Sequence, residues 1–351
     1  MLNRRQLTTI IINAITIKML VTFPRNAIVL CGNAAWISAI YCTLIAAGLF
    51  WLISVTYTSK KSVIEIAESI GGKWLQMTVG LIVFVILAAN FFPFINIFSE
   101  IIRLALLQQT PIEIIVLLLI IAIVLGAYCG IEAIGRVHGL FIPIIGAVFV
   151  IFILMLIPAF QIDNIMPVMG NGIYNLFVKN ISFLSLFADL LMLNILIPYT
   201  KNIGEYKKSG IKGVFIGGAY AIIIFAVYGL SYAYPVSEKF IVPIYQLEKL
   251  IRLSNFFSRL EAVFQFVWSI SILLYGSLYA AVLAEVWRSG FGLKKSKPLI
   301  LPITAILVGA ALFPGSFAKT IIWEEVINKW IYIPAFLIPI IMGILGRIRK
   351  I

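Results

Sequence analysis

Long apolar runs separated by short polar segments make up almost the whole chain. Roughly twenty apolar residues cross a bilayer as a helix, so each long run predicts one membrane span. Alternating ten-residue segments, which are typical of transmembrane strands, are absent, and we therefore expect an all-α integral membrane protein. The ten predicted spans are residues 6–23, 34–57, 76–106, 112–130, 138–160, 180–200, 211–233, 258–287, 298–314 and 329–346.

Two of the polar connections have helical patterns of their own. Residues 61–74 are amphipathic and predict a helix that lies along the inner membrane surface. Residues 235–257 carry apolar side chains at helical spacing and predict an outer surface helix. That helix either gates a site or simply packs on the bundle. Within the third span Pro93 predicts a kink, because proline removes a helical hydrogen bond.

The composition agrees with an integral membrane protein and narrows the choice of function. Of the 351 residues, 62% are apolar and 12% are charged, which predicts a single transmembrane domain over residues 1–351. The net charge of +13 comes from basic residues in short loops, so we expect a lipid bilayer as partner and no nucleic acid. Their distribution predicts cytoplasmic N- and C-termini. Three cysteines and one histidine without metal or catalytic spacing predict no metal, no cofactor and no enzyme.

The first and sixth spans share an unusual pattern, a buried charge followed by a proline. Lys18 lies near the middle of the first span, which is predicted to end at Pro24. Asp189 lies near the middle of the sixth span, which is predicted to end at Pro198. A charge near the bilayer centre costs about 3 kcal/mol or more and therefore indicates a functional site.

Each half holds five predicted spans, and an odd number of spans reverses the direction in which the next half crosses the membrane. The second half is therefore predicted to repeat the first half with inverted topology. The two halves are residues 1–160 and 161–351, and in such five-plus-five inverted repeats the first helix of each half is often broken. A broken helix offers free N–H groups at a positive dipole end and free carbonyls, and an amino acid zwitterion needs both. The predicted ligand-binding residues are Ile15, Thr16, Lys18, Asn90, Phe91, Asp189, Asn194, Trp268, Ser271 and Tyr275.

Each buried charge has two interpretations. Lys18 is either a fixed cation, which replaces a sodium ion or meets a substrate carboxylate, or one half of a structural ion pair with Asp189. Asp189 either binds a substrate amine, or takes up a proton, or serves only as the partner of Lys18 in that pair. Asn194 is expected near the same depth, where it adds an amide. Glu100 and Arg103, three residues apart on the third span, predict a simple ion pair.

Short motifs lie in a characteristic order along nearly the whole chain. They are Pro24 with Ala35-Trp36-Ile37-Ser38, Ser99-Glu100-Ile101-Ile102 with Gln109-Thr110-Pro111, Gly130-Ile131-Glu132-Ala133-Ile134-Gly135-Arg136, Asn164-Ile165-Met166-Pro167-Val168 with Gly172, Ile197-Pro198, and Arg259-Leu260-Glu261 with Trp268. In their order and spacing the chain resembles the spore germination permeases. These are the B-type subunits of nutrient germinant receptors, within the amino acid–polyamine–organocation transporter superfamily.

The resemblance implies a ten-helix, five-plus-five, LeuT-like fold in the inner membrane of endospores, that is, in a cytoplasmic membrane. It also implies small nutrients, chiefly amino acids, as ligands, and an A-type membrane subunit and a C-type lipoprotein as partners. The chain departs from the family where a glycine usually lies near the first-helix break, within Ala14–Lys18, and at Ala34, where an acidic residue is frequent. Without the glycine, either the helix breaks less or Lys18 satisfies the freed carbonyls itself.

Three functions remain open on these grounds. The first is a receptor subunit that binds a small nutrient and triggers germination. The second is a proton-coupled amino acid permease, in which a fixed Lys18 replaces sodium and Asp189 carries the proton. The third is a scaffold that binds no ligand, or an ion-conducting subunit.

Overall fold

The computed structural model describes residues 1–251 and 260–350, without the side chains of residues 235 and 260–262. The tripeptide Arg259-Leu260-Glu261 therefore lies outside the described side chains, whereas Trp268 of the same motif is described. Helices are the only named elements in the described part, which confirms the all-α prediction. One isolated backbone bridge joins Leu2 to Thr200.

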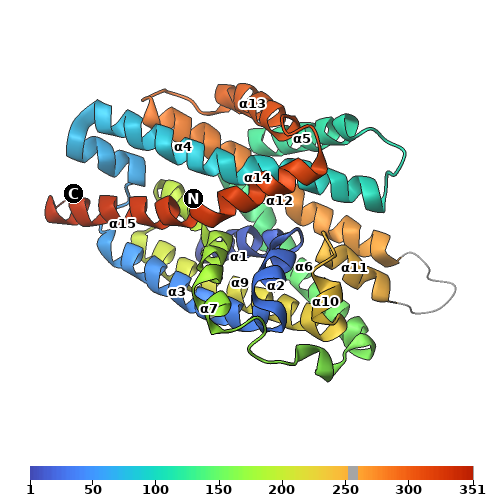
Figure 1. Cartoon of the computed structure of the whole chain (residues 1–351). Helices are drawn as coiled ribbons and strands as arrows, with labels where there is room; N and C mark the ends of the chain where they lie inside the picture. Colours follow the sequence, from blue (N-terminus) through green and yellow to red (C-terminus); the bar gives the residue numbers. More distant parts are fainter. Residues whose placement is uncertain (252–259, 351) are drawn as a thin grey trace.

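The α-helices follow one another with short connections (Figure 1). They are α1 (Arg4–Met19), α2 (Phe23–Cys31), α3 (Ala35–Thr56), α4 (Val63–Ala105), α5 (Ile112–Tyr128), α6 (Ile131–Leu156), α7 (Ile173–Phe177), α8 (Leu190–Leu196), α9 (Ile203–Ser231), α10 (Tyr234–Ser237), α11 (Pro243–Leu250), α12 (Leu260–Gly290), α13 (Ile300–Leu312), α14 (Phe317–Trp330) and α15 (Tyr332–Ile348). Six 3₁₀ segments connect them: η1 (Gly32–Ala34), η2 (Ile157–Ala159), η3 (Ile162–Ile165), η4 (Lys179–Phe187), η5 (Ile197–Tyr199) and η6 (Lys297–Leu299).

Seven helical segments in the described residues are long and apolar enough to cross a membrane. They are Phe23–Thr56, Val63–Ala105, Ile131–Ala159, Ile173–Tyr199, Ile203–Ser231, Val263–Gly290 and Phe317–Ile348. Two shorter apolar helices, Ile112–Tyr128 and Lys297–Leu312, come close to that length. The chain is thus a multi-pass membrane protein, while ten spans, an inverted repeat and cytoplasmic termini stay predictions.

The prediction for the end of the first helix was wrong. α1 ends at Met19, and after a turn the helix resumes as α2 at Phe23, with Pro24 in its first turn. Proline is favoured there because the first helical N–H groups have no partner in the helix. Pro24 therefore starts the second half of a broken helix, and the break forms without a glycine between Ala14 and Lys18.

The sixth predicted span is also interrupted, and in its middle. The segment begins as 3₁₀ helix η4 and passes through Asp189 before α8 starts at Leu190. Pro198 lies in η5, directly after α8. Both charges predicted for the bilayer centre thus lie beside an interruption of a helix, where backbone groups lack their helical partners.

The helices form two groups with a third element between them. Figure 1 shows α4, α5, α12 and α13 on one side and α1, α2, α3 and α9 on the other, and α15 runs between them. Contacts agree, because α12 packs on α4 and α5, α9 packs on α1 and α3, and α15 touches both α3 and α4. Between the two groups, α8 contacts α4 and α12, and α1 contacts α12.

Several predicted helix boundaries differ from the structure. The last predicted span began at residue 329, but helical structure already begins at Phe317, which brings Glu324 and Glu325 into a helix. Residues 252–257 of the predicted surface helix over 235–257 lie outside the described residues. Its described part holds two short helices, α10 and α11, and α11 packs against α9 and α12. Within α4, Gly71 and Gly72 have non-helical angles and separate the amphipathic segment from the long helix.

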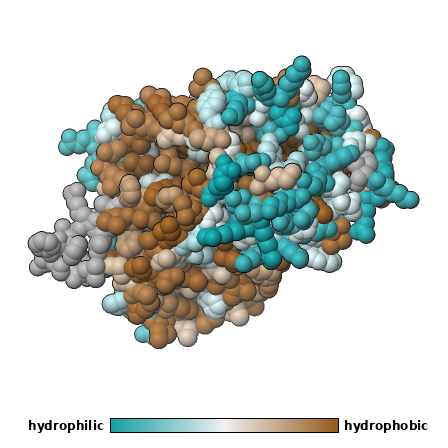
Figure 2. Space-filling model, turned by 180° about the vertical axis from the view of Figure 1, so that it is seen from behind, coloured by the Kyte–Doolittle hydropathy of each residue, from teal (hydrophilic) through white to brown (hydrophobic). Residues whose placement is uncertain are grey.

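The surface has a broad apolar face. Figure 2 shows hydrophobic residues gathered over one part of the molecule and hydrophilic residues at the opposite end. Exposed residues with large apolar side chains include Trp51, Leu117, Val150, Leu301 and Ile306. Apolar side chains exposed in such numbers are stable in lipid rather than in water.

Candidate functional site

An ion pair between Lys18 and Asp189 lies at the centre of the molecule. Lys18 Nζ is 3.1 Å from Asp189 Oδ2, and the two side chains are only 6% and 1% exposed. Lys18 comes from the last turn of α1, and Asp189 lies between η4 and α8. Charges at this depth require a partner, because desolvation of an unpaired charge costs several kcal/mol.

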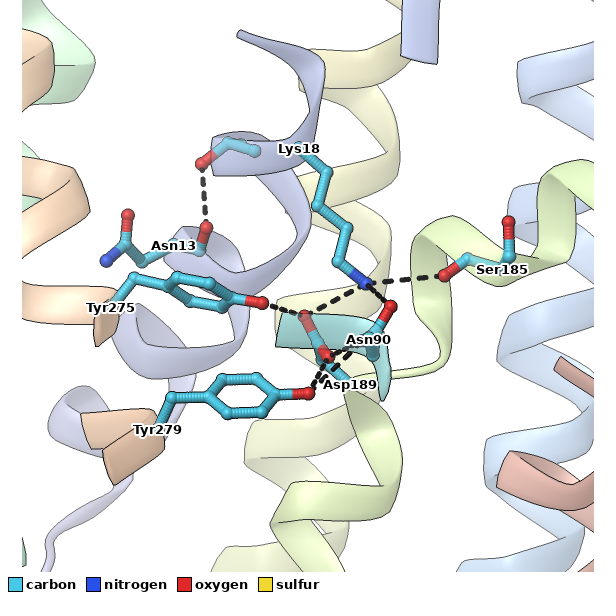
Figure 3. A network of polar contacts seen from close by, with 8 residues as sticks. Asn13, Lys18, Asn90, Ser185, Asp189, Tyr275 and Tyr279 are labelled. Carbon is cyan, nitrogen blue, oxygen red and sulfur yellow. Dashed lines mark hydrogen bonds and ion pairs between the residues drawn. The ribbon is translucent and has the colours of Figure 1, made fainter. Parts of the chain in front are cut away.

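Three further side chains complete the hydrogen bonding of this pair (Figure 3). The hydroxyl groups of Tyr275 and Tyr279 each donate to the Asp189 carboxylate at 2.9 Å. The Asn90 amide donates to Asp189 at 2.5 Å, and its oxygen accepts from Lys18 at 3.3 Å. We call these five residues the Lys18–Asp189 cluster.

The helices place these side chains by simple spacing. The two tyrosines are four residues apart on α12, so they project from the same face of that helix. Asn90 comes from α4, where the neighbouring Phe91 stacks on Tyr279 with 4.5 Å between ring centroids. The cluster thus joins both interrupted segments to the two long helices α4 and α12.

Lys18 also bonds to the other interrupted segment. Its Nζ donates to the backbone carbonyl of Ser185 in η4 at 3.4 Å. The expectation that the first helix breaks less without a glycine was wrong, because α1 ends at Met19 and α2 begins only at Phe23. Lys18 bonds to a carbonyl of η4 rather than to one of its own helix, and that carbonyl also accepts the backbone N–H of Ala188 at 3.1 Å.

Four predicted ligand-binding residues lie together in the cluster, namely Lys18, Asn90, Asp189 and Tyr275. Phe91 packs against it through its ring, and Ile15 borders a small cavity of about 10 Å³ beside Asp189. These six residues come from α1, α4, α12 and the sixth segment, as the sequence predicted.

Three other predicted residues lie at a separate place. Thr16, Trp268 and Ser271 border a cavity of about 40 Å³ at the side of α1. Thr16 donates to the carbonyl of Ile12, and Trp268 donates to Glu248 at 2.9 Å. Ser271 donates to the side chain of Asn13. Trp268 and Ser271 thus use their polar groups to join α12 to α11 and α1, whereas Thr16 bonds within α1.

Asn194 does not join the cluster. Its amide donates to the Leu190 carbonyl at 3.1 Å, and its oxygen accepts from the Tyr206 hydroxyl at 2.9 Å. It lies five residues after Asp189 in the sequence. Asn194 was expected near the depth of Asp189, but its hydrogen bonds go to Leu190 and Tyr206 instead. The predicted pair of Glu100 and Arg103 is confirmed, with 2.5 Å between charged atoms.

The sequence reasoning missed a second set of contacts, between the first helix break and α14. The Thr22 hydroxyl donates to Glu324 at 2.5 Å, and Arg25 pairs with Glu325 at 3.2 Å. Two adjacent carboxylates within the apolar run from residue 317 were the available signal. Both carboxylates lie between the predicted spans 298–314 and 329–346, where a charge needs no buried partner.

Two neighbouring cavities lie along these contacts. The Lys18 cavity is about 20 Å³, enough for a water molecule, and is bordered by Lys18, Asn90, Glu324 and Asn328. A larger space of about 580 Å³ lies between α2, residues 178–185 and α14, and we call it the α2–α14 cavity. Phe23 and Asn328 border both, so the two cavities adjoin.

Comparison with known sequences gives one consistent family. The family profile described as Spore germination protein matches residues 1–316. Spore germination protein A2 and spore germination protein YndE, both from Bacillus subtilis (strain 168), are 25% and 26% identical to the chain. These alignments cover 99% and 98% of the chain, and 96% of each relative.

Comparison with solved structures gives the fold. MHP1, a nucleobase-cation-symport-1 family transporter in a closed conformation with bromovinylhydantoin bound, has a TM-score of 0.59 at 12% identity. That match covers 99% of this chain and 93% of MHP1. A mutant of the Eremococcus coleocola manganese transporter has a TM-score of 0.57 at 11% identity, over 96% of this chain and 78% of its own. Family and fold are those of germination proteins and transporters, not of enzymes.

Proposed function

The chain belongs to the spore germination protein family, and from that premise we propose that it is the nutrient-binding subunit of a spore germinant receptor. It has a transporter fold and a germinant-receptor or transporter role. The proposal adds that a small amino acid is the ligand, that the spore inner membrane is the location, and that an A-type membrane subunit and a C-type lipoprotein are the partners.

The Lys18–Asp189 cluster is the observation that carries the proposal. It joins two interrupted helices to α4 and α12 through charged hydrogen bonds in a buried place. A charged network of this kind has few intermediate arrangements, because a partly broken one leaves a buried charge unpaired. A ligand that binds one arrangement better shifts the population toward it, and partner subunits can respond to that shift.

The sizes of the two cavities support a proposal in which the ligand binds at one place and the Lys18–Asp189 cluster responds at another. The Lys18 cavity is too small for an amino acid, whereas the α2–α14 cavity is in the size range of small-molecule sites. In our proposal the nutrient binds in the α2–α14 cavity and contacts the segments that carry the cluster. The predicted site residues around Lys18 then form the part of the molecule that responds to the bound nutrient.

The test is one proteoliposome assay of amino acid binding and time-dependent uptake, with a labelled panel that includes alanine. We expect saturable binding without accumulation, because a receptor subunit needs occupancy and not turnover. Lys18→Met serves as the cluster variant, and Lys208→Met, which makes the same substitution at an exposed position of α9, serves as the matched control. Absence of binding to the chain, both alone and co-expressed with its partner subunits, would refute the proposal.

A proton-coupled amino acid permease is the second candidate, and the likeness to solved transporters favours it. Lys18 would be the fixed cation and Asp189 the proton carrier. This function predicts accumulation that an uncoupler abolishes. The same assay therefore separates the two candidates.

A further inference from the structure

Three buried polar atoms at the α2–α14 cavity have no hydrogen-bond partner among the described residues. They are Asn180 Nδ2, Ser185 Oγ and Asn328 Nδ2. Asn180 and Ser185 are only 2% and 1% exposed, so bulk water does not compensate them. Leaving such groups unpaired is unfavourable, and three of them around one cavity indicate a polar ligand that bonds to them.

The charges around the cavity indicate the sign of that ligand. Lys179 and Lys329 border the cavity, while Glu325, the acidic residue at its border, is neutralised by Arg25 at 3.2 Å. The net charge of the side chains around the cavity is therefore positive. A carboxylate fits both features, because it carries the opposite charge and its two oxygens accept several hydrogen bonds.

We infer that the α2–α14 cavity is a carboxylate-binding site, in which Asn180, Ser185 and Asn328 determine the class of nutrient. The inference rests on the proposed function and adds the chemistry of the ligand. Apolar surface from Phe23, Phe183 and other aromatic rings borders the same cavity and accommodates a short side chain. The ligand is thus a small carboxylate-bearing nutrient.

Ser185 connects this site to the Lys18–Asp189 cluster. Ser185 borders the cavity, its hydroxyl group has no partner among the described residues, and its backbone carbonyl accepts from Lys18 Nζ at 3.4 Å. A carboxylate that bonds to the hydroxyl therefore acts on the residue that holds Lys18. Occupancy of the cavity reaches the buried pair through one residue, without contact between ligand and Lys18.

The test measures equilibrium binding to the purified full-length chain in lipid nanodiscs. The probes are the twenty amino acids and their carboxamides, which keep the ammonium group and the side chain but lack the carboxylate. We expect amidation to weaken the binding of any amino acid ligand roughly ten- to hundredfold, because hydrogen bonds to a charged group are lost. Ser185→Ala and Asn328→Leu should each weaken acid binding about tenfold and weaken amide binding less, because the amide oxygen forms only neutral hydrogen bonds with these donors.

Asn26→Leu is the matched control, because Asn26 borders the same cavity but is not among the three unpartnered groups. We expect it to leave the ratio of acid to amide affinity unchanged, and a general folding defect would not alter that ratio either. If acid and amide bind equally, or if Ser185→Ala and Asn328→Leu behave like the control, the inference is overturned and the proposed function stands. If no amino acid binds, both the inference and the proposed function are refuted.

Discussion

At the scale of single residues, the buried pair of Lys18 and Asp189 decides how the centre of the molecule is built. Each charge satisfies the other, and Asn90 bonds to both. Removing one partner leaves the other charge buried without compensation, which is more costly than removing both. The pair therefore acts as a unit, and its variants should be compared as a set.

We predict that Lys18→Met lowers the free energy of unfolding by about 3–5 kcal/mol. The double variant Lys18→Met/Asp189→Asn should recover a large part of this loss, since no buried charge is left. Thermal unfolding in detergent micelles measures both. Lys208→Met is the control and should change stability by no more than about 0.5 kcal/mol, because Lys208 is an exposed residue of α9. Additive losses in the double variant would contradict a mutually compensating pair.

Tyr275 and Tyr279 give a second prediction at this scale. Each hydroxyl group donates to the Asp189 carboxylate, so Tyr275→Phe and Tyr279→Phe should each cost about 1.5–3 kcal/mol of unfolding free energy. Tyr128→Phe, at an exposed tyrosine, should change stability by no more than about 0.5 kcal/mol. The same unfolding assay decides. Equal effects at all three tyrosines would show that Asp189 does not depend on these donors.

Much of this cluster could be predicted from the sequence, because a charge in an apolar run must find a partner. That reasoning identified Lys18, Asp189, Asn90 and Tyr275. It failed for Asn194, because depth along a helix does not give the direction of a side chain. It also gave no role to Ser185, whose contribution to the cluster is a backbone carbonyl that no residue type encodes.

At the scale of elements, interruptions rather than regular helices define the site. The cluster lies beside the two breaks, after Met19 and around Asp189, and Lys18 bonds to the Ser185 carbonyl in the 3₁₀ segment before Asp189. Two prolines in the sequence correctly predicted broken helices. Pro24, however, was predicted to end the first helix, and it lies in the first turn of α2 instead. A proline is compatible with the end of one helix and with the first turn of the next, and only the geometry distinguishes them.

Gly72 gives a prediction for a different interruption, the one within α4. Its φ of +66° lies in a region that favours glycine, and an added Cβ would meet no neighbour within 4 Å. Gly72→Ala should therefore cost about 1–3 kcal/mol through backbone strain alone. Gly48→Ala is the control, an exposed position within helix α3 that is also free of neighbours, and should be neutral or stabilising. Equal stability of both variants would contradict a required turn at Gly72.

At the scale of the whole molecule, α14 holds the broken first helix in place beside the α2–α14 cavity. Thr22 and Arg25 bond to Glu324 and Glu325 across that boundary. The sequence could not predict this contact, because it joins residues about 300 positions apart and α14 begins earlier than its hydropathy suggests. Closure of the cavity should therefore depend on charge complementarity between α2 and α14.

A charge exchange tests this dependence. Arg25→Glu should weaken amino acid binding up to about fivefold, the range expected for a partly exposed pair, because it places two like charges together. Arg25→Glu with Glu325→Arg should restore the affinity. Equilibrium binding in nanodiscs measures the three proteins. A double variant that binds as weakly as the single one would argue against a contact that closes the cavity.

The central claim is that nutrient occupancy is communicated through the Lys18–Asp189 cluster. Its most direct test is the germination dose–response of spores that carry Lys18→Met or Asp189→Asn at normal protein levels. We predict that the nutrient concentration for half-maximal germination rises by about tenfold or that the response is lost, within the usual range of coupling between two sites. A dose–response identical to that of the unmodified protein would contradict the claim.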